Sequence, residues 1–148
     1  MGACEAHWTV EPAWFAPNEV QEIVQAALDH GDRPEAELSV VFVDDPTLAR
    51  MHAEFLGDPS PTDVISFDLG DEGPGPVGEL YVSVDCARRV AAERGVPVER
   101  ELALYLVHGT LHLCGWDDHD PEDRAEMRQA EALVLGRLGF GPDPLPHD

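Results

Sequence analysis

The sequence predicts an α+β fold: a mixed four-stranded sheet packed with about five helices in a single domain spanning residues 1–148. Two observations lead to this prediction. Short segments with strand-like composition alternate with longer segments whose apolar residues have helical spacing, without internal repeats. The length of 148 residues, with 43% apolar and 26% charged residues, suits one globular core of ordinary composition.

Four segments have the composition of β-strands. Leu38–Val43 is rich in β-branched residues, as expected of a buried strand. The other three are His7–Val10, Asp63–Phe67 and Glu79–Val84. The glycines and prolines of Gly70–Gly78 predict a flexible loop between the last two strands.

Five segments have helical spacing of apolar residues. They are Asn18–His30, Asp45–Phe55, Asp85–Arg94, Pro97–Cys114 and Pro121–Leu138, each with a glycine at or just beyond its end. Asp45 followed by Pro46 predicts the N-cap and first residue of the second helix. The fourth helix is apolar on nearly every face and is expected to be central. The proline-rich tail 140–148 is expected to be irregular.

The sequence carries no sign of a membrane or secretory protein. Met1–Trp14 contains Glu5 and Glu11 but no basic residue, and the longest apolar run, Leu102–Val107, is far shorter than a membrane span. We therefore expect a cytoplasmic protein without membrane association. Three cysteines without a CxxC pair predict reduced thiols with no disulfide partner: Cys4, Cys86 and Cys114. Cys114 could be a ligand, but a buried apolar thiol is the preferred interpretation.

The charge balance is strongly acidic. There are 30 acidic residues against 9 basic ones, for a net charge of −21, and every basic residue is an arginine. Phosphate binding normally uses clustered basic residues, and the longest basic run here is Arg88-Arg89, which works against a nucleic-acid partner. The alternative interpretation is a solubility or high-salt adaptation of the whole surface, which says little about a site.

Two histidines on the apolar fourth helix form a candidate metal site. His108 and His112 are four residues apart in HGTLH, so both imidazoles lie on one face, about one turn apart, as in zinc-binding helices. Two buried histidines with few polar neighbours are costly without a shared partner, although a hydrogen-bonded core pair is the alternative. We therefore predict one transition-metal ion, preferably zinc, bound by this pair.

The turn after Gly115 offers a third ligand. Its candidates are Asp117, Asp118, His119 and Asp120. Three protein ligands leave a fourth position for water, which is typical of a catalytic zinc site. One of these acids is also expected to cap the helix near Pro121. In HExxH metalloproteases the general base follows the first histidine; Gly109 stands there, so peptide hydrolysis by that mechanism is not expected.

Several segments together carry a family resemblance. His108–Gly115 reads HGTLHLCG with Met127 downstream, Pro61–Phe67 reads PTDVISF, and Gly78–Ser83 reads GELYVS. They resemble the YbeY endoribonucleases, whose patterns are HGxLHLxGxDH with a methionine nine residues later, PTDVLSF and GDIVIS. The resemblance covers nearly the whole chain. It implies a small α+β protein that binds a zinc-like ion through three ligands and acts on RNA, with the ribosomal small subunit as partner.

Two positions depart from the family pattern. Counted back from Met127 without a gap, the family's third histidine falls on Asp118, and His119 comes one residue later. Register favours Asp118, and a carboxylate is an acceptable zinc ligand. Ligand type favours His119. Leu56 stands where the family's YRGKDxPT segment has an arginine, thought to help at the scissile phosphate. Loss of such electrostatic help can lower a rate by orders of magnitude.

Three functional hypotheses follow. The first, implied by the resemblance, is a weak metal-dependent, single-strand endoribonuclease that acts in 3′-end maturation of 16S rRNA and in ribosome quality control. The second is a ribosome-associated assembly or binding factor whose zinc site is mainly structural. The third is a metallohydrolase of another substrate.

Several residue roles stay open on the sequence alone. The general base has five candidates: Glu54, Asp58, Asp63, Asp117 and Asp120. The basic candidates nearest in sequence that could replace the missing arginine are Arg50, Arg88 and Arg89. The remaining histidines have no motif around them and are expected in surface or cap roles: His7, His30, His52 and His147.

Overall fold

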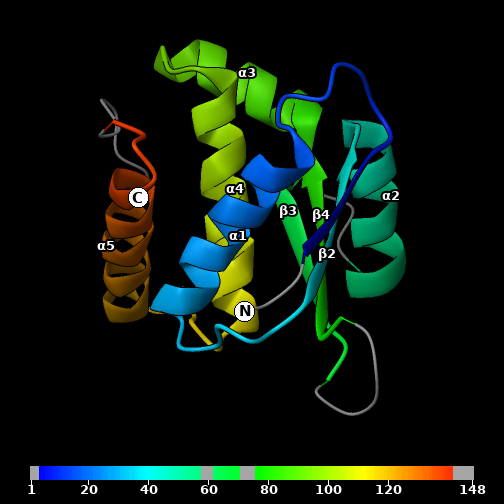
Figure 1. The fold of residues 1–148 in the computed structure, drawn as a ribbon. Helices are drawn as coiled ribbons and strands as arrows, with labels where there is room; N and C mark the ends of the chain where they lie inside the picture. Colours follow the sequence, from blue (N-terminus) through cyan, green and yellow to red (C-terminus); the bar gives the residue numbers. More distant parts are fainter. Residues whose placement is uncertain (1–3, 58–61, 71–75, 142–148) are drawn as a thin grey trace.

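A four-stranded sheet lies at the centre of the computed structural model, which describes residues 4–57, 62–70 and 76–141 (Figure 1). The strand order is β1-β2-β4-β3. β1, β2 and β4 are parallel, whereas β3 runs antiparallel to β4. The sheet is therefore mixed, and the predicted α+β class is confirmed. β3 is an edge strand of this sheet.

The strands are close to their predicted positions, with one correction. Their bounds are β1 Cys4–Trp8, β2 Leu38–Val43, β3 Val64–Asp68 and β4 Gly78–Ser83. The prediction of a first strand at His7–Val10 was wrong in position, because Cys4–Trp8 is the segment that pairs with β2. Of the predicted Gly70–Gly78 loop, residues 71–75 lie outside the described residues.

All five predicted helices are confirmed. Their bounds are α1 Pro17–His30, α2 Asp45–Leu56, α3 Val84–Arg94, α4 Val98–Leu113 and α5 Pro121–Arg137. The N-cap of α2 is Asp44 and not Asp45 as predicted. Asp44 has extended backbone angles, and its side chain accepts a hydrogen bond from the Thr47 N–H at 2.8 Å. Residues 142–148 of the predicted irregular tail lie outside the described part of the chain.

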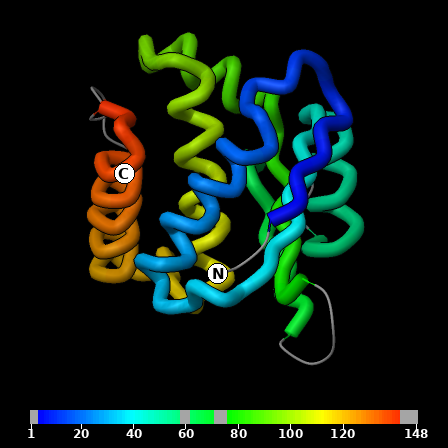
Figure 2. Tube along the Cα trace, in the orientation of Figure 1, coloured from blue at the N-terminus to red at the C-terminus, as the bar shows by residue number. Residues whose placement is uncertain are grey.

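The helices cover the two faces of the sheet unequally. α1, α4 and α5 lie on one side, and α2 covers the other (Figures 1 and 2). The larger core fills the space under α1, α4 and α5, and includes the fully buried Phe42, Leu80 and Leu106. A smaller core of Val43, Leu48 and Ile65 lies under α2. The two sides of the sheet therefore differ in how much apolar surface they bury.

α4 is the central helix, as predicted. Of its residues, only Val98 and Glu99 at the start and His108 and His112 further along are not buried. A helix that is apolar on nearly all sides is stabilised by packing on several neighbours. The two histidines are thus the exceptions on an otherwise buried surface. No helix among the described residues is both long and apolar enough to cross a membrane.

Candidate metal centre

α4 presents His108 and His112 side by side, and beyond its first two residues they are its two positions that are not buried. Their Nε2 atoms are 3.0 Å apart. The side chains are 17% and 30% exposed, respectively, so both rings can be reached from solvent. The spacing of four residues produces this arrangement directly, because such residues share one face of a helix.

The chain reverses direction after α4 and brings Asp118 back to the histidines. Gly115 has φ 95°, a left-handed conformation that glycine adopts without a steric penalty. The Trp116 N–H then donates to the Leu111 carbonyl at 3.0 Å, which closes the turn. As a result, Asp118 Oδ2 lies 3.6 Å from His108 Nε2, and Asp118 Oδ1 lies 3.6 Å from His112 Nε2.

These three side chains fit one transition-metal ion. One ligand atom from each lies within 4.8 Å of the other two. Atoms that share a zinc ion at about 2.0–2.2 Å lie roughly 3–4 Å from each other. Two imidazole nitrogens and a carboxylate oxygen are ligand types that zinc uses. The arrangement can therefore hold an ion through three ligands and leave a fourth position open.

The structure places the two candidates for the third ligand differently. His119 is 88% exposed, and its Nε2 lies 3.3 Å from Asp117 Oδ1. Asp118 is only 27% exposed and faces both histidines. Asp117, Asp118 and His119 also come close enough to one another to bind an ion, but two of the three are exposed. The geometry favours Asp118 over His119, and ligation itself stays a prediction.

Burial keeps His112 in the form that binds metals. Removal from water lowers the pKa of His112, and the neighbouring His108 ring lowers this pKa further. Asp118 and a backbone hydrogen bond with Trp116 act in the opposite direction, without reversing the shift. Near neutral pH the ring is therefore uncharged, as a metal-ligating imidazole must be.

Two residues of α5 complete the surroundings of the histidines. The Glu131 side chain is 3% exposed, and its Oε2 lies 2.5 Å from His108 Nδ1. Its other oxygen accepts a hydrogen bond from Arg128 Nη1. Arg128 Nη2 lies 3.9 Å from Asp118 Oδ2. Sequence reasoning missed both residues, because no local pattern links positions on α5 to a histidine on α4.

The histidines lie along a groove of about 520 Å³ between β3, α4 and the end of α2. The residues that line it are Leu56, Thr62–Ser66, Asp68, His108, His112, Leu113 and His119. The edge strand β3 thus forms the wall opposite the candidate metal centre. Leu56 lines the groove and is 56% exposed, so the position where the resemblance places an arginine does face this space.

The candidates for a general base differ in whether they line the groove. Asp63 lines the groove. Asp120 is the N-cap of α5 and accepts a hydrogen bond from the Asp123 N–H at 2.8 Å, so one acid of the turn caps this helix, as expected. Asp117 accepts hydrogen bonds from the backbone of the same turn. Glu54 is exposed on α2, and Asp58 lies outside the described residues. Of the candidates among the described residues, Asp63 is the one that lines the groove and is therefore best placed to act on a substrate bound there.

Gly109 is required by the close contact between α4 and the sheet. A Cβ atom at this position would lie 2.9 Å from Leu80 Cδ2 and 3.1 Å from Ser66 Oγ. The Ser66 hydroxyl also donates to the Gly109 carbonyl at 3.1 Å. The residue after His108 therefore points at the sheet, where a glutamate general base of the HExxH type has no room.

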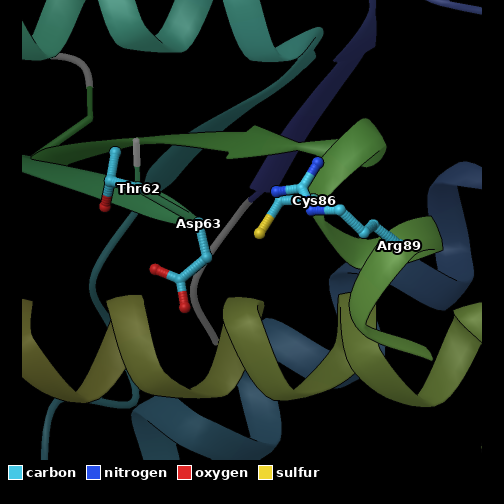
Figure 3. Close-up of a pocket in the computed structure, with 4 residues that line it drawn as sticks. All are labelled: Thr62, Asp63, Cys86 and Arg89. Carbon is cyan, nitrogen blue, oxygen red and sulfur yellow. The ribbon is translucent and has the colours of Figure 1, made fainter. Parts of the chain in front are cut away.

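None of the three basic candidates lines the groove beside the histidines. Arg89 lines a neighbouring pocket of about 390 Å³ with Cys86 and with Thr62 and Asp63, which also line the groove (Figure 3). Its guanidinium donates to Asp45 Oδ2 at 2.8 Å, so much of its charge is already paired. Arg50 and Arg88 are exposed and line neither this pocket nor the groove.

The other cysteines and histidines that the structure describes are not part of the cluster. Cys114 is half-buried beside the core, and burial raises its pKa, in agreement with the apolar interpretation. His7 is exposed on β1, and His30 packs its ring against Trp116. His52 lies on α2, and His147 is outside the described residues.

Comparisons with known proteins agree with this architecture. The profile of the family described as Endoribonuclease YbeY matches residues 11–139. A Desulforamulus reducens protein named Endoribonuclease YbeY is 40% identical over 130 residues, which cover 82% of this chain and 85% of that protein. A Rhodopirellula baltica protein of the same name is 43% identical over 120 residues, or 80% of this chain and 61% of that protein.

A solved structure is similar in fold. The solution structure of TM1509 from Thermotoga maritima superposes with a TM-score of 0.61, at 21% identity, over 97% of this chain and 99% of that one. The fold and the cluster define a small α+β protein in which a buried helix and the turn after it bring two histidines and a carboxylate together. By its sequence, this chain belongs to the Endoribonuclease YbeY family.

Proposed function

We propose that this protein is a metal-dependent endoribonuclease that cleaves single-stranded RNA in the groove between β3 and α4, with one zinc ion per chain. The observation that carries the proposal is that the Asp118 carboxylate meets His108 Nε2 and His112 Nε2, the two histidines that line this groove. RNA is the proposed substrate because the relatives are named endoribonucleases.

The residues around the groove have distinct proposed roles. His108, His112 and Asp118 would hold the ion. A bound ion of this kind polarises a phosphate oxygen or lowers the pKa of a water molecule. Asp63, on the opposite wall, is the candidate that accepts a proton from the attacking group. His119, which lines the groove and is largely exposed, is free to contact substrate without being a ligand.

The resemblance supports a more specific proposal about the biological role. The substrate would be the 3′ end of 16S rRNA, and the partner would be the ribosomal small subunit in the cytoplasm, with a role in ribosome quality control. The net charge of −21 opposes binding to a phosphate backbone. Leu56 adds no positive charge to the groove, so isolated RNA should be cleaved slowly. Salt screens the repulsion between the acidic protein and the RNA, so cleavage should be faster at higher ionic strength than at low salt.

A second candidate function is an assembly factor in which the ion is mainly structural. The contacts that favour it join three successive segments. Asp118 from the turn and Glu131 from α5 both approach His108 of α4. An ion in the cluster would then fix the turn against α4 and stabilise the fold without any chemistry.

The two candidates can be separated by metal analysis and RNA cleavage. We expect purified protein to contain about one zinc ion per chain, and His112→Ala to contain almost none. Cleavage of a single-stranded RNA should be weak, and it should disappear on chelation and in His108→Ala. His7→Ala, a change on the exposed side of β1, is the control and should match wild type in both measurements.

Each result has a clear consequence. Metal binding without cleavage would favour the structural role. Cleavage that survives both chelation and His108→Ala would show that the cluster is not responsible for it. Equal zinc in wild type and His112→Ala would contradict the metal site itself.

A further inference from the structure

Glu131 is a buried carboxylate that faces the candidate metal centre from α5. It is 3% exposed, and both of its oxygens have partners. Oε2 pairs with His108 Nδ1, and Oε1 accepts a hydrogen bond from Arg128 Nη1, both at 2.5 Å. Burying a charged group is costly unless it is paired and hydrogen-bonded, so both partners are needed to offset the cost.

The contact with Glu131 determines which nitrogen of His108 faces the groove. A carboxylate oxygen accepts hydrogen bonds, so its contact with Nδ1 places a ring N–H of His108 on that nitrogen. The lone pair is then on Nε2, the atom that lies 3.0 Å from His112 Nε2 and 3.6 Å from Asp118 Oδ2. This tautomer is the one that a ligating Nε2 requires.

Arg128 holds the second oxygen of Glu131 and also borders the cluster. It is three residues before Glu131 on α5 and 26% exposed. Its Nη2 lies 3.9 Å from Asp118 Oδ2. Asp118 stands where the resemblance places a neutral histidine, so the cluster has one more negative charge than the family pattern implies. The guanidinium lies beside both carboxylates and offsets part of that charge.

We propose that Glu131 is a positioning residue for the metal ion, acting through His108, and that Arg128 holds the Glu131 carboxylate in the orientation that meets the imidazole. The inference rests on the proposed function in one respect: it takes an ion as the group that His108 holds. Carboxylates in this outer position typically change metal affinity by about 10- to 100-fold.

A purely structural ion pair between α4 and α5 would behave differently. Replacing such a pair by apolar residues of similar size is often neutral or stabilising for the fold. The double variant Arg128→Leu with Glu131→Leu therefore separates the two roles. A structural pair predicts a folded protein with unchanged zinc affinity. A positioning role predicts a folded protein with weaker zinc binding.

The experiment measures zinc affinity by competition with a chromophoric chelator. Glu131→Gln keeps the size of the side chain and removes its charge, and we expect about 10- to 100-fold weaker binding. Glu126→Gln is the matched control, since it makes the same change at an exposed position of the same helix and should bind zinc as wild type does. The double leucine variant should lose affinity by at least as much as Glu131→Gln.

A second readout does not depend on metal or on RNA. Ring ¹⁵N chemical shifts of His108 in the metal-free protein should show Nδ1 protonated in wild type and a shift toward Nε2 protonation in the double leucine variant. Unchanged shifts together with wild-type zinc affinity would overturn the inference. If wild type binds no zinc, the proposed function fails, and the ¹⁵N shifts alone decide whether Glu131 orients the ring.

Discussion

The two walls of the groove differ in how many polar groups are held in fixed positions by packing and hydrogen bonds. On the α4 side, His108, His112 and Asp118 converge within 4.8 Å, and buried Glu131 supports them from behind. On the α2 and β3 side, Leu56 is 56% exposed. Polar groups held by packing and hydrogen bonds are preorganised for binding, whereas an exposed leucine contributes no charge to a phosphate site.

This difference indicates which step is expected to limit the activity of the protein: the handling of RNA and not the binding of the ion. The α4 wall has the features of a complete site for an ion. The opposite wall has a base candidate in Asp63 but no cation among the described residues that line the groove. Ion binding should therefore be robust to changes on the α2 side, whereas the handling of RNA should be sensitive to them.

The largest expected effect is a loss of stability when a large side chain is placed between α4 and the sheet. Gly109→Glu places a charged side chain where even a Cβ would lie 2.9 Å from Leu80 Cδ2. Overpacking and burial of an unpaired charge should lower the free energy of unfolding by about 3 kcal/mol or more. Denaturant unfolding would measure this change. Gly136→Glu on α5 is the control, since among the described residues no atom beyond the adjoining turns of α5 itself lies within 4 Å of a Cβ there. Equal stability of the two variants would contradict the close packing of α4 on β3.

A smaller effect is expected from the third ligand on the α4 wall. Asp118→Ala should weaken zinc binding by roughly 100-fold, because losing a ligand should cost at least as much as losing an outer-sphere partner. His119→Ala should bind zinc as wild type does, since its ring faces Asp117 and is 88% exposed. Titration with zinc under chelator competition measures both variants. The reverse pattern would make His119 the ligand, and full retention in both would place the third ligand elsewhere.

The smallest expected effect concerns the opposite wall. Leu56→Arg adds a cation to the groove and should raise kcat/KM for single-stranded RNA by about tenfold. Leu133→Arg makes the same change in charge at a leucine that is 52% exposed on α5 and does not line the groove. Both variants would be assayed at matched salt. Equal gains would mean that net charge alone limits the reaction, and no gain in either would mean that a missing cation is not limiting.

Local patterns in the sequence were sufficient for most of the fold. The β-branched run Leu38–Val43 and the apolar helix containing His108 were both predicted, because strand and helix periodicity are properties of neighbouring residues. The errors were also local. The first strand was placed too late, and Asp45 was chosen as the α2 cap where Asp44 caps it. Two adjacent aspartates offer the same chemistry, and only backbone conformation distinguishes them.

The sequence by itself determined the pair His108 and His112, because an i,i+4 spacing on an apolar helix already brings two side chains to one face. The tertiary structure decided what surrounds that pair. It turned Asp118 toward the histidines and His119 toward solvent, and it brought Glu131 to His108 Nδ1. Glu131 is 23 residues away from His108 in the chain. Such a contact depends on how α5 packs against α4, which no local periodicity encodes.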